Sequence, residues 1–128
     1  MRRILEELKF NGLSRKDPRL ASFFDMAGKL PDGRHSALSF EQFEEMLSLD
    51  CGPLLERTLK GTLVVPSFPD LTAKVDEIYE EVRTIKDGAN ASYIPQLADI
   101  DPNLFAVAIS TVDGQFYGVG DTAKPFCA

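Results

Sequence analysis

The stretch FAVAISTVDG, residues 105–114, decides the fold of the C-terminal half of the chain. Its alternation places Phe105, Val107 and Ile109 on one side of a β-strand, but the residues between them are also largely apolar, so we expect cover on both sides. Asp-Gly is a preferred dipeptide of two-residue hairpins, so residues 115–119 are predicted to fold back antiparallel. Two strands alone are marginally stable in water. We therefore expect this hairpin to be the start of a larger domain that the chain contains only in part.

The composition bounds the class of protein. Its 128 residues are 44% hydrophobic and 27% charged, which is ordinary for a globular protein and gives no candidate membrane span. The formal net charge of -6 arises in residues 65–128, where ten Asp/Glu stand against four Lys/Arg, so nucleic acid is not an expected partner. The start MRRILEEL has neither the apolar run of a secretory signal nor the acid-poor character of a transit peptide. No targeting peptide is visible.

The two cysteines, Cys51 and Cys127, are far apart in the sequence. Neither belongs to a CxxC motif or has a histidine at metal-ligand spacing. We expect both to be inert thiols of a protein in a reducing compartment.

Residues 1–66 carry the signals of several short helices. Asp17-Pro18 is a helix start, because the carboxylate can accept a free backbone N–H and Pro at the first helical position sacrifices no needed donor. Ser39 and Gln42 form a capping box at the next helix, and Gly61 is expected to end a third. The residues predicted to face inward on the first two helices are Leu20, Phe23, Phe24, Ala27, Phe40, Phe43, Met46 and Leu47.

The longest helix is predicted over residues 69–86, with Asp87-Gly88 as its stop. Its apolar residues recur at steps of three and four, and Tyr79 among them is read as a packing residue. The acidic pairs Asp76-Glu77 and Glu80-Glu81 are predicted to lie on the opposite face. A solvated surface explains them better than a cation site.

The turn around Gly33 invites a test for a calcium-binding EF-hand loop. With Gly33 at the sixth position of such a loop, Gly28, Leu30 and Asp32 take the first, third and fifth positions, and Ser39 stands where the bidentate Glu belongs. This ligand set fails. The sequence predicts a calcium-free helix-loop-helix unit and no metal site.

Three further candidates have simpler explanations. Ser110 is a hydroxyl in a strand, but no Lys or His is placed to activate it as a nucleophile. His35 is read as a solvated loop residue, because it has no Cys, Asp or His at ligand spacing. Gly118, Gly120 and Asp121 lack the following helix of a phosphate-binding fingerprint, so they predict a turn.

Four motifs occur together in the C-terminal part: YIPQLA at 93–98, TVDGQ at 111–115, GDT at 120–122 and PFC at 125–127. In these motifs the chain resembles the serine-dependent glutaminases, enzymes with a beta-lactamase-like catalytic domain. Further upstream it is similar to the EF-hand-like helical region that precedes this domain in the animal kidney-type and liver-type enzymes. That second likeness rests on GL at 12–13, DPRL at 17–20, VP at 65–66 and DEIYE at 76–80.

The resemblance implies an α+β chain in two parts. Residues 1–66 would be the EF-hand-like helical region. Residues 67–128 would be the first helix and the β-hairpin of an incomplete beta-lactamase-like glutaminase domain, which stops before the family's Ser-x-x-Lys motif. We expect the isolated chain to be inactive for that reason, whether it is a fragment, an incomplete gene model or a splice product.

The resemblance also implies a reaction. Glutaminases hydrolyse L-glutamine to L-glutamate and ammonia through a serine nucleophile that the motif's lysine helps to deprotonate, and no cofactor is expected. One site residue carries over: Tyr93 matches the tyrosine that hydrogen-bonds the bound ligand in the family. From its position alone, Tyr93 would be read as a buried structural tyrosine.

Partners and location follow from resemblance only. The complete enzyme is expected to form a homo-oligomer, a dimer or tetramer, and to act in mitochondria. The alternative function is a non-catalytic helical module, residues 1 to about 87, that binds another protein or mediates oligomerisation.

Overall fold

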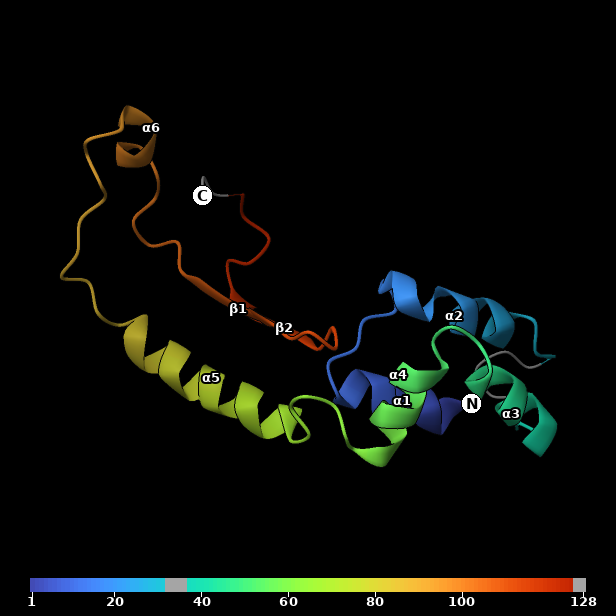
Figure 1. The fold of residues 1–128 in the computed structure, drawn as a ribbon. Helices are drawn as coiled ribbons and strands as arrows, with labels where there is room; N and C mark the ends of the chain where they lie inside the picture. The colour runs from blue at the N-terminus through green and yellow to red at the C-terminus, as the bar shows by residue number, and fades with distance from the viewer. Residues whose placement is uncertain (32–36, 126–128) are drawn as a thin grey trace. The chain divides into compact units, whose positions relative to one another are not determined.

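The structure is a computed structural model, and it describes residues 1–31 and 37–125. It contains helices and a two-stranded antiparallel sheet, which confirms the mixed α and β content (Figure 1). The elements are α1 (Arg2–Phe10), the 3₁₀ helix η1 (Pro18–Leu20), α2 (Ala21–Gly28), α3 (Phe40–Leu47), α4 (Gly52–Lys60), α5 (Phe68–Val82), α6 (Pro95–Ala98), β1 (Ala106–Ser110) and β2 (Phe116–Gly120). No helix in the described ranges is long and apolar enough to cross a membrane.

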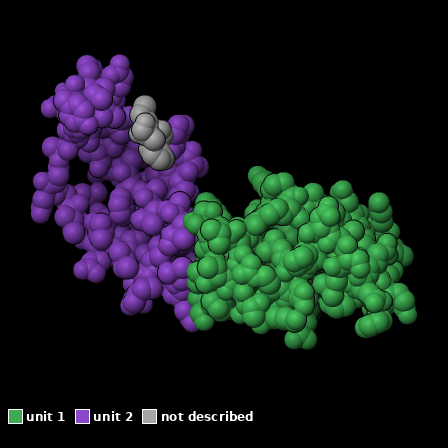
Figure 2. Space-filling model, viewed as in Figure 1, with its two compact units in different colours: residues 1–69, 110–116 green, residues 70–109, 117–128 purple. Residues whose placement is uncertain are grey.

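The chain divides into two compact units, coloured separately in Figure 2. The first contains residues 1–69 and 110–116, and the second contains residues 70–109 and 117–128. The tip of the hairpin therefore belongs to the helical unit, although it is distant from that unit in the sequence. The boundary predicted after residue 66 stays a prediction.

The first unit has its own hydrophobic core. In it α4 lies against both α1 and α3 (Figure 1). Leu20 and Phe23 are fully buried, and Phe24 packs edge-on against Phe23 at 5.1 Å between ring centroids. This confirms the inward face predicted for α2. The buried core residues are Leu8, Leu13, Leu20, Phe23, Ala27, Leu30, Met46, Cys51, Leu55 and Leu63.

Local capping signals were read correctly. The side chain of Asp17 accepts a hydrogen bond from the backbone N–H of Arg19, although the first turn that follows is η1 rather than α-helix. Ser39 and Gln42 form both hydrogen bonds of the capping box. A cap of this kind contributes about 1 kcal/mol to stability. Gly61 ends α4 in the left-handed conformation with φ of 64°.

The prediction that Phe40 faces inward is wrong. Met46 is buried and Phe43 and Leu47 are partly buried, but the side chain of Phe40 is 75% exposed. Helical side chains lean toward the helix N-terminus. As the first residue of α3, Phe40 therefore points past the end of the packed face.

Helix α5 is shorter than predicted, ending at Val82 instead of near Asp87-Gly88. The hydroxyl of Thr84 donates to the carbonyl of Glu81 at 2.7 Å, and the N–H of Ile85 bonds the carbonyl of Val82 at 3.0 Å. These contacts satisfy helix-end carbonyls and tighten the last turn, so the helix needs no glycine to stop.

The hairpin has the predicted strands but a longer connection. Thr111 donates its N–H to the carbonyl of Gln115 at 3.0 Å, so three residues, not two, lie between the paired positions. The last of the three is Gly114, with φ of 84°. This matches a three-residue loop in which a left-handed glycine makes the bulge. Val107 and Ile109 are partly buried, whereas Ala106, Ala108 and Ser110 are exposed, so the described residues cover one face of β1.

The hairpin tip is bound to the helical unit through Asp113. Both carboxylate oxygens accept from Arg57, at 2.6 and 2.9 Å, and one also accepts from the N–H of Val64 at 2.6 Å. The guanidinium of Arg19 donates to the Asp113 carbonyl at 2.7 Å and to the carboxylate of Asp17 at 2.7 Å. Bidentate charge-assisted bonds of this kind are both strong and specific in geometry.

Gln115 makes the second connection. Its side chain is fully buried, donates to the Val65 carbonyl at 2.9 Å and accepts from the Val65 N–H at 3.3 Å. The backbone of Gln115 forms an antiparallel bridge with Leu13, and the N–H of Phe116 donates to the Gly12 carbonyl at 2.9 Å. We call Asp113, Gln115 and the groups they bind the hairpin anchor.

Gly12 is expected to tolerate no side chain. Its φ is 73°, and a Cβ would lie 2.2 Å from the Phe68 ring. We predict that Gly12→Ala lowers the free energy of unfolding by about 3 kcal/mol, from backbone strain and displacement of the buried ring. Gly28→Ala is the matched control: a Cβ there meets nothing within 4 Å. In a helix that change is worth up to about 1 kcal/mol of stabilisation. Urea titration measures the change in the free energy of unfolding for both variants. Equal changes would contradict the strain that we assign to a side chain at Gly12.

The ion pair predicts unequal costs for its two partners. The side chain of Asp113 is 7% exposed and that of Arg57 is 46% exposed. Arg57→Met leaves a buried carboxylate unpaired and should cost about 3 kcal/mol. Asp113→Asn leaves a cation that water can reach and should cost about half as much. Lys60→Met, in the same helix but in an exposed pair with Glu56, should cost less than about 0.5 kcal/mol. Denaturant unfolding measures all three, and a reversed order for the first two would refute this reading.

Candidate functional site

Tyr93, the one residue the sequence nominated for substrate binding, lies just before the short helix α6. Ile94 is the N-cap residue of that helix and Pro95 its first residue. Tyr93 is 81% exposed within residues 1–128. Its phenol is therefore accessible to a ligand.

Asn90 closes the loop that carries Tyr93. Its side-chain amide donates to the carbonyl of Ala98 at 3.4 Å and to the carbonyl of Ile100. The two ends of the segment 90–100 are thereby tied together. Sequence reasoning missed Asn90, and the available signal was only an asparagine two residues after Gly88, a residue type that often bonds nearby backbone.

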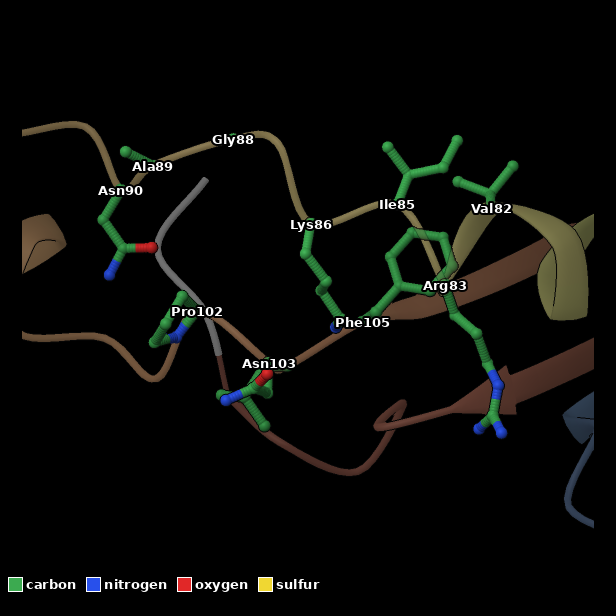
Figure 3. A pocket seen from close by; sticks show the side chains of 11 residues that line it. Val82, Arg83, Ile85, Lys86, Gly88, Ala89, Asn90, Pro102, Asn103 and Phe105 are labelled. Carbon is green, nitrogen blue, oxygen red and sulfur yellow. The ribbon is translucent and has the colours of Figure 1, made fainter.

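An open hollow of about 510 Å³ lies beside this loop within the second unit. The segments 82–90 and 102–105 bound it on two sides (Figure 3). Its lining is mainly apolar, with Arg83 and Lys86 contributing cationic side chains. The residues are Val82, Arg83, Ile85, Lys86, Gly88, Ala89, Asn90, Pro102, Asn103, Leu104 and Phe105.

A second hollow of about 470 Å³ shares Asn90, Leu104 and Phe105 with the first. It also includes Leu97 of α6 and Asp121 after β2. The three shared residues therefore separate two adjacent depressions. Hollows that combine apolar walls with a few polar groups are the usual setting of ligand sites.

Phe105 is fixed from three directions. Its ring stacks on Tyr79 at 5.2 Å between centroids with an interplanar angle of 10°. Its N–H donates to the Asp121 carboxylate at 3.2 Å, and its carbonyl accepts from the Asp121 N–H at 3.1 Å. Gly120 has φ of 81°, and a Cβ there would lie 2.3 Å from the Phe105 carbonyl oxygen. A turn follows at Gly120 and Asp121, whose carbonyls accept from the N–H groups of Thr122 and Lys124, but Gly118 lies inside β2, so the turn predicted for Gly118 is wrong.

The acidic face of α5 differs from the prediction at one residue. Glu77, Glu80 and Glu81 are exposed, but Asp76 is half-buried and accepts a hydrogen bond from the Tyr117 hydroxyl. This bond raises the pKa of Tyr117, because the phenol proton is held against a neighbouring carboxylate. In the first unit, the Arg19 side chain lowers the pKa of Asp17 in the same way that any close cation favours a carboxylate.

The remaining candidates are not brought together. Ser110 is exposed at the end of β1, and Cys51 is buried, accepting a hydrogen bond from the Ser22 hydroxyl at 3.5 Å. Gly33, His35 and Cys127 lie outside the described residues. Within the described part of the chain, no three His, Cys, Asp or Glu side chains are grouped to hold a metal ion. Phe105 lines both hollows, whereas Tyr93 lines neither of them.

The glutaminase family model matches residues 88–128. The chain is 36% identical over 122 residues to the mitochondrial glutaminase liver isoform of Rattus norvegicus, which covers 94% of this chain and 20% of that protein. It is 53% identical over 65 residues to a glutaminase of Corynebacterium efficiens, covering 51% of this chain and 14% of that protein.

A glutaminase of Trichormus variabilis is 40% identical over 67 residues, which is 52% of this chain and 20% of that protein. The chain thus spans about a fifth or less of the length of these curated relatives. The rat relative matches nearly the whole chain, helical unit included.

The Asp76–Tyr117 bond predicts a pH effect. Because the folded-state pKa of Tyr117 lies above the ordinary value of 10.0, the stabilisation is fully present below that pH and is lost as pH rises through the folded pKa. Ultraviolet titration of the wild type minus Tyr117→Phe should give a midpoint above 10.0. Asp76→Asn, which keeps an acceptor oxygen but removes the charge, should lower this midpoint. A wild-type midpoint at or below the ordinary value would disprove the bond.

Proposed function

Because this chain belongs to the glutaminase family, we propose that it is the N-terminal part of an enzyme that hydrolyses L-glutamine to L-glutamate and ammonia. The observation that carries the proposal is the 36% identity to the rat liver isoform across 94% of the chain. In this proposal residues 1–66 are the EF-hand-like region, and residues 67–128 begin a beta-lactamase-like catalytic domain.

The proposed chemistry uses a serine nucleophile from a Ser-x-x-Lys motif. Residues 1–128 contain no serine followed three positions later by lysine. The serine hydroxyl attacks the side-chain amide carbon, backbone N–H groups hold the oxyanion, ammonia leaves, and water then releases glutamate from the acyl-enzyme. Neither the acylation of the serine nor the hydrolysis of the acyl-enzyme requires a metal or an organic cofactor.

Within this chain, Tyr93 is the proposed substrate-contacting residue. Its exposed phenol can donate a hydrogen bond to glutamine, and the Asn90 contacts support the loop in one conformation. Preorganisation of this kind lowers the entropic cost of binding. The nucleophile and the lysine would come from outside these residues.

Location and assembly are proposed from the relatives alone. The rat and mouse relatives are named as mitochondrial, so we propose the same compartment for the complete enzyme. We propose that the complete enzyme forms a dimer or tetramer. The second candidate function, a non-catalytic interaction module, is favoured by the separate hydrophobic core of the first unit. Capture of full-length glutaminase by the isolated chain, with no ammonia release, is the result that would favour it.

Tyr93→Phe in the complete enzyme tests the proposal. Loss of one hydrogen bond to a charged ligand should lower kcat/KM for glutamine by about tenfold to a hundredfold. Thermal unfolding should not change, because the Tyr93 side chain is 81% exposed.

Tyr117→Phe is the matched control, since its hydroxyl bonds Asp76 and not the proposed substrate. It should leave the KM for glutamine unchanged. Residues 1–128 alone should release no ammonia above a buffer blank. Release of ammonia by the isolated chain would contradict the proposal that the nucleophile lies outside residues 1–128, and an unaltered kcat/KM in Tyr93→Phe would rule out Tyr93 as a substrate contact.

A further inference from the structure

We propose that Asp113 is a positioning residue for the glutaminase reaction, held by Arg57 so that the hairpin tip fixes the pairing of β1 with β2 during turnover. The inference rests on the proposed function for its kinetic consequence. Its structural basis, the hairpin anchor, is independent of the reaction. It gives the helical unit a role in catalysis without any contact with the substrate.

The first step is that the tip is fixed by groups outside the sheet. Asp113 is 5% exposed, and its carboxylate receives three donors, two from Arg57 and one from the N–H of Val64. Its backbone carbonyl receives a fourth donor, from Arg19. A carboxylate with this many donors has one orientation, so the three-residue connection has one conformation.

The second step concerns register. Gln115 is paired twice, by its backbone with Thr111 and by its buried side-chain amide with Val65. A slip of one residue turns every side chain to the opposite face of a sheet. Such a slip would remove the Gln115 amide from Val65 and leave a buried polar group without partners, which is strongly unfavourable. The anchor therefore locks the pairing of β1 with β2.

The third step connects this register to the candidate site. The residue before β1 is Phe105 and the residue after β2 is Asp121, and they exchange two hydrogen bonds, at 3.1 and 3.2 Å. Both line the second hollow, and Phe105 lines the first as well. A loosened strand pair would displace Phe105 relative to Asp121 and would disturb the segment that continues from β2.

The experiment uses the complete enzyme with Arg57→Met, and Lys60→Met as the matched control. Both changes remove one cation from α4, but the partner of Lys60 is the exposed Glu56. We expect Arg57→Met to lower kcat by about tenfold, with KM changing less than about twofold because Tyr93 is untouched. Rates are counted per reactive site, titrated with a covalent glutamine analogue, so that unfolded molecules do not enter the value.

Two further variants separate positioning from simple loss of fold. Arg57→Lys keeps the charge but not the bidentate fork, and should restore part of kcat. Asp113→Asn should also lower kcat, with a smaller loss of stability than Arg57→Met. Hydrogen exchange should show faster exchange at the amides of Thr111, Gln115 and Phe116 in Arg57→Met, with the α1 amides unchanged.

The outcomes are distinct. If the wild-type enzyme does not hydrolyse glutamine, the proposed function fails. The hydrogen-exchange experiment then still tests whether the hairpin anchor depends on Arg57. If kcat per reactive site in Arg57→Met equals that of Lys60→Met, Asp113 does not position the site. Unchanged exchange at the hairpin tip would overturn the anchor itself.

Discussion

The ion pair between Asp113 and Arg57 is the constraint on which the first compact unit depends to hold the hairpin tip. It joins residues 56 positions apart and buries a carboxylate at the tip of a hairpin that would be marginally stable alone. Because a buried charge is tolerated only with its partners in place, the tip and the helical unit should form and dissolve together. This is why a segment from the C-terminal half belongs to the first compact unit.

Local features of the fold were predictable because their causes are local. The Asp17 cap, the capping box of Ser39 with Gln42, and the left-handed Gly61 each act within one turn of chain. The strand alternation at 105–109 is equally local. Two errors occurred at helix ends, where neither apolar spacing nor a glycine signal marks the last packed or last helical residue. Phe40 fits the apolar spacing but lies beyond the packed face, and the Thr84 hydroxyl ends α5 before its glycine signal.

The candidate site also contains some residues that the sequence predicted and others that it did not. Tyr93 was predicted from a motif that resembles the glutaminases, and its role in substrate binding stays a prediction. Asn90, Phe105 and the Asp76–Tyr117 bond were not found, because each depends on which distant backbone or side chain it meets. The acidic run on α5 was read as uniformly solvated, and the strand that brings Tyr117 to Asp76 could not be placed from spacing alone. Contacts between residues that are distant in the sequence set these positions, and sequence periodicity does not encode such contacts.

A double-mutant cycle on Arg57 and Asp113 tests the central claim most directly. Arg57 also donates to the Thr62 carbonyl, so the single change Arg57→Met measures more than the ion pair. The cycle of Arg57→Met, Asp113→Asn and the double variant cancels that extra contribution. Measured by urea unfolding, the coupling free energy should be about 2 kcal/mol. Additive effects, with a coupling below about 0.5 kcal/mol, would show that the Arg57–Asp113 pair does not hold the hairpin tip in the first unit.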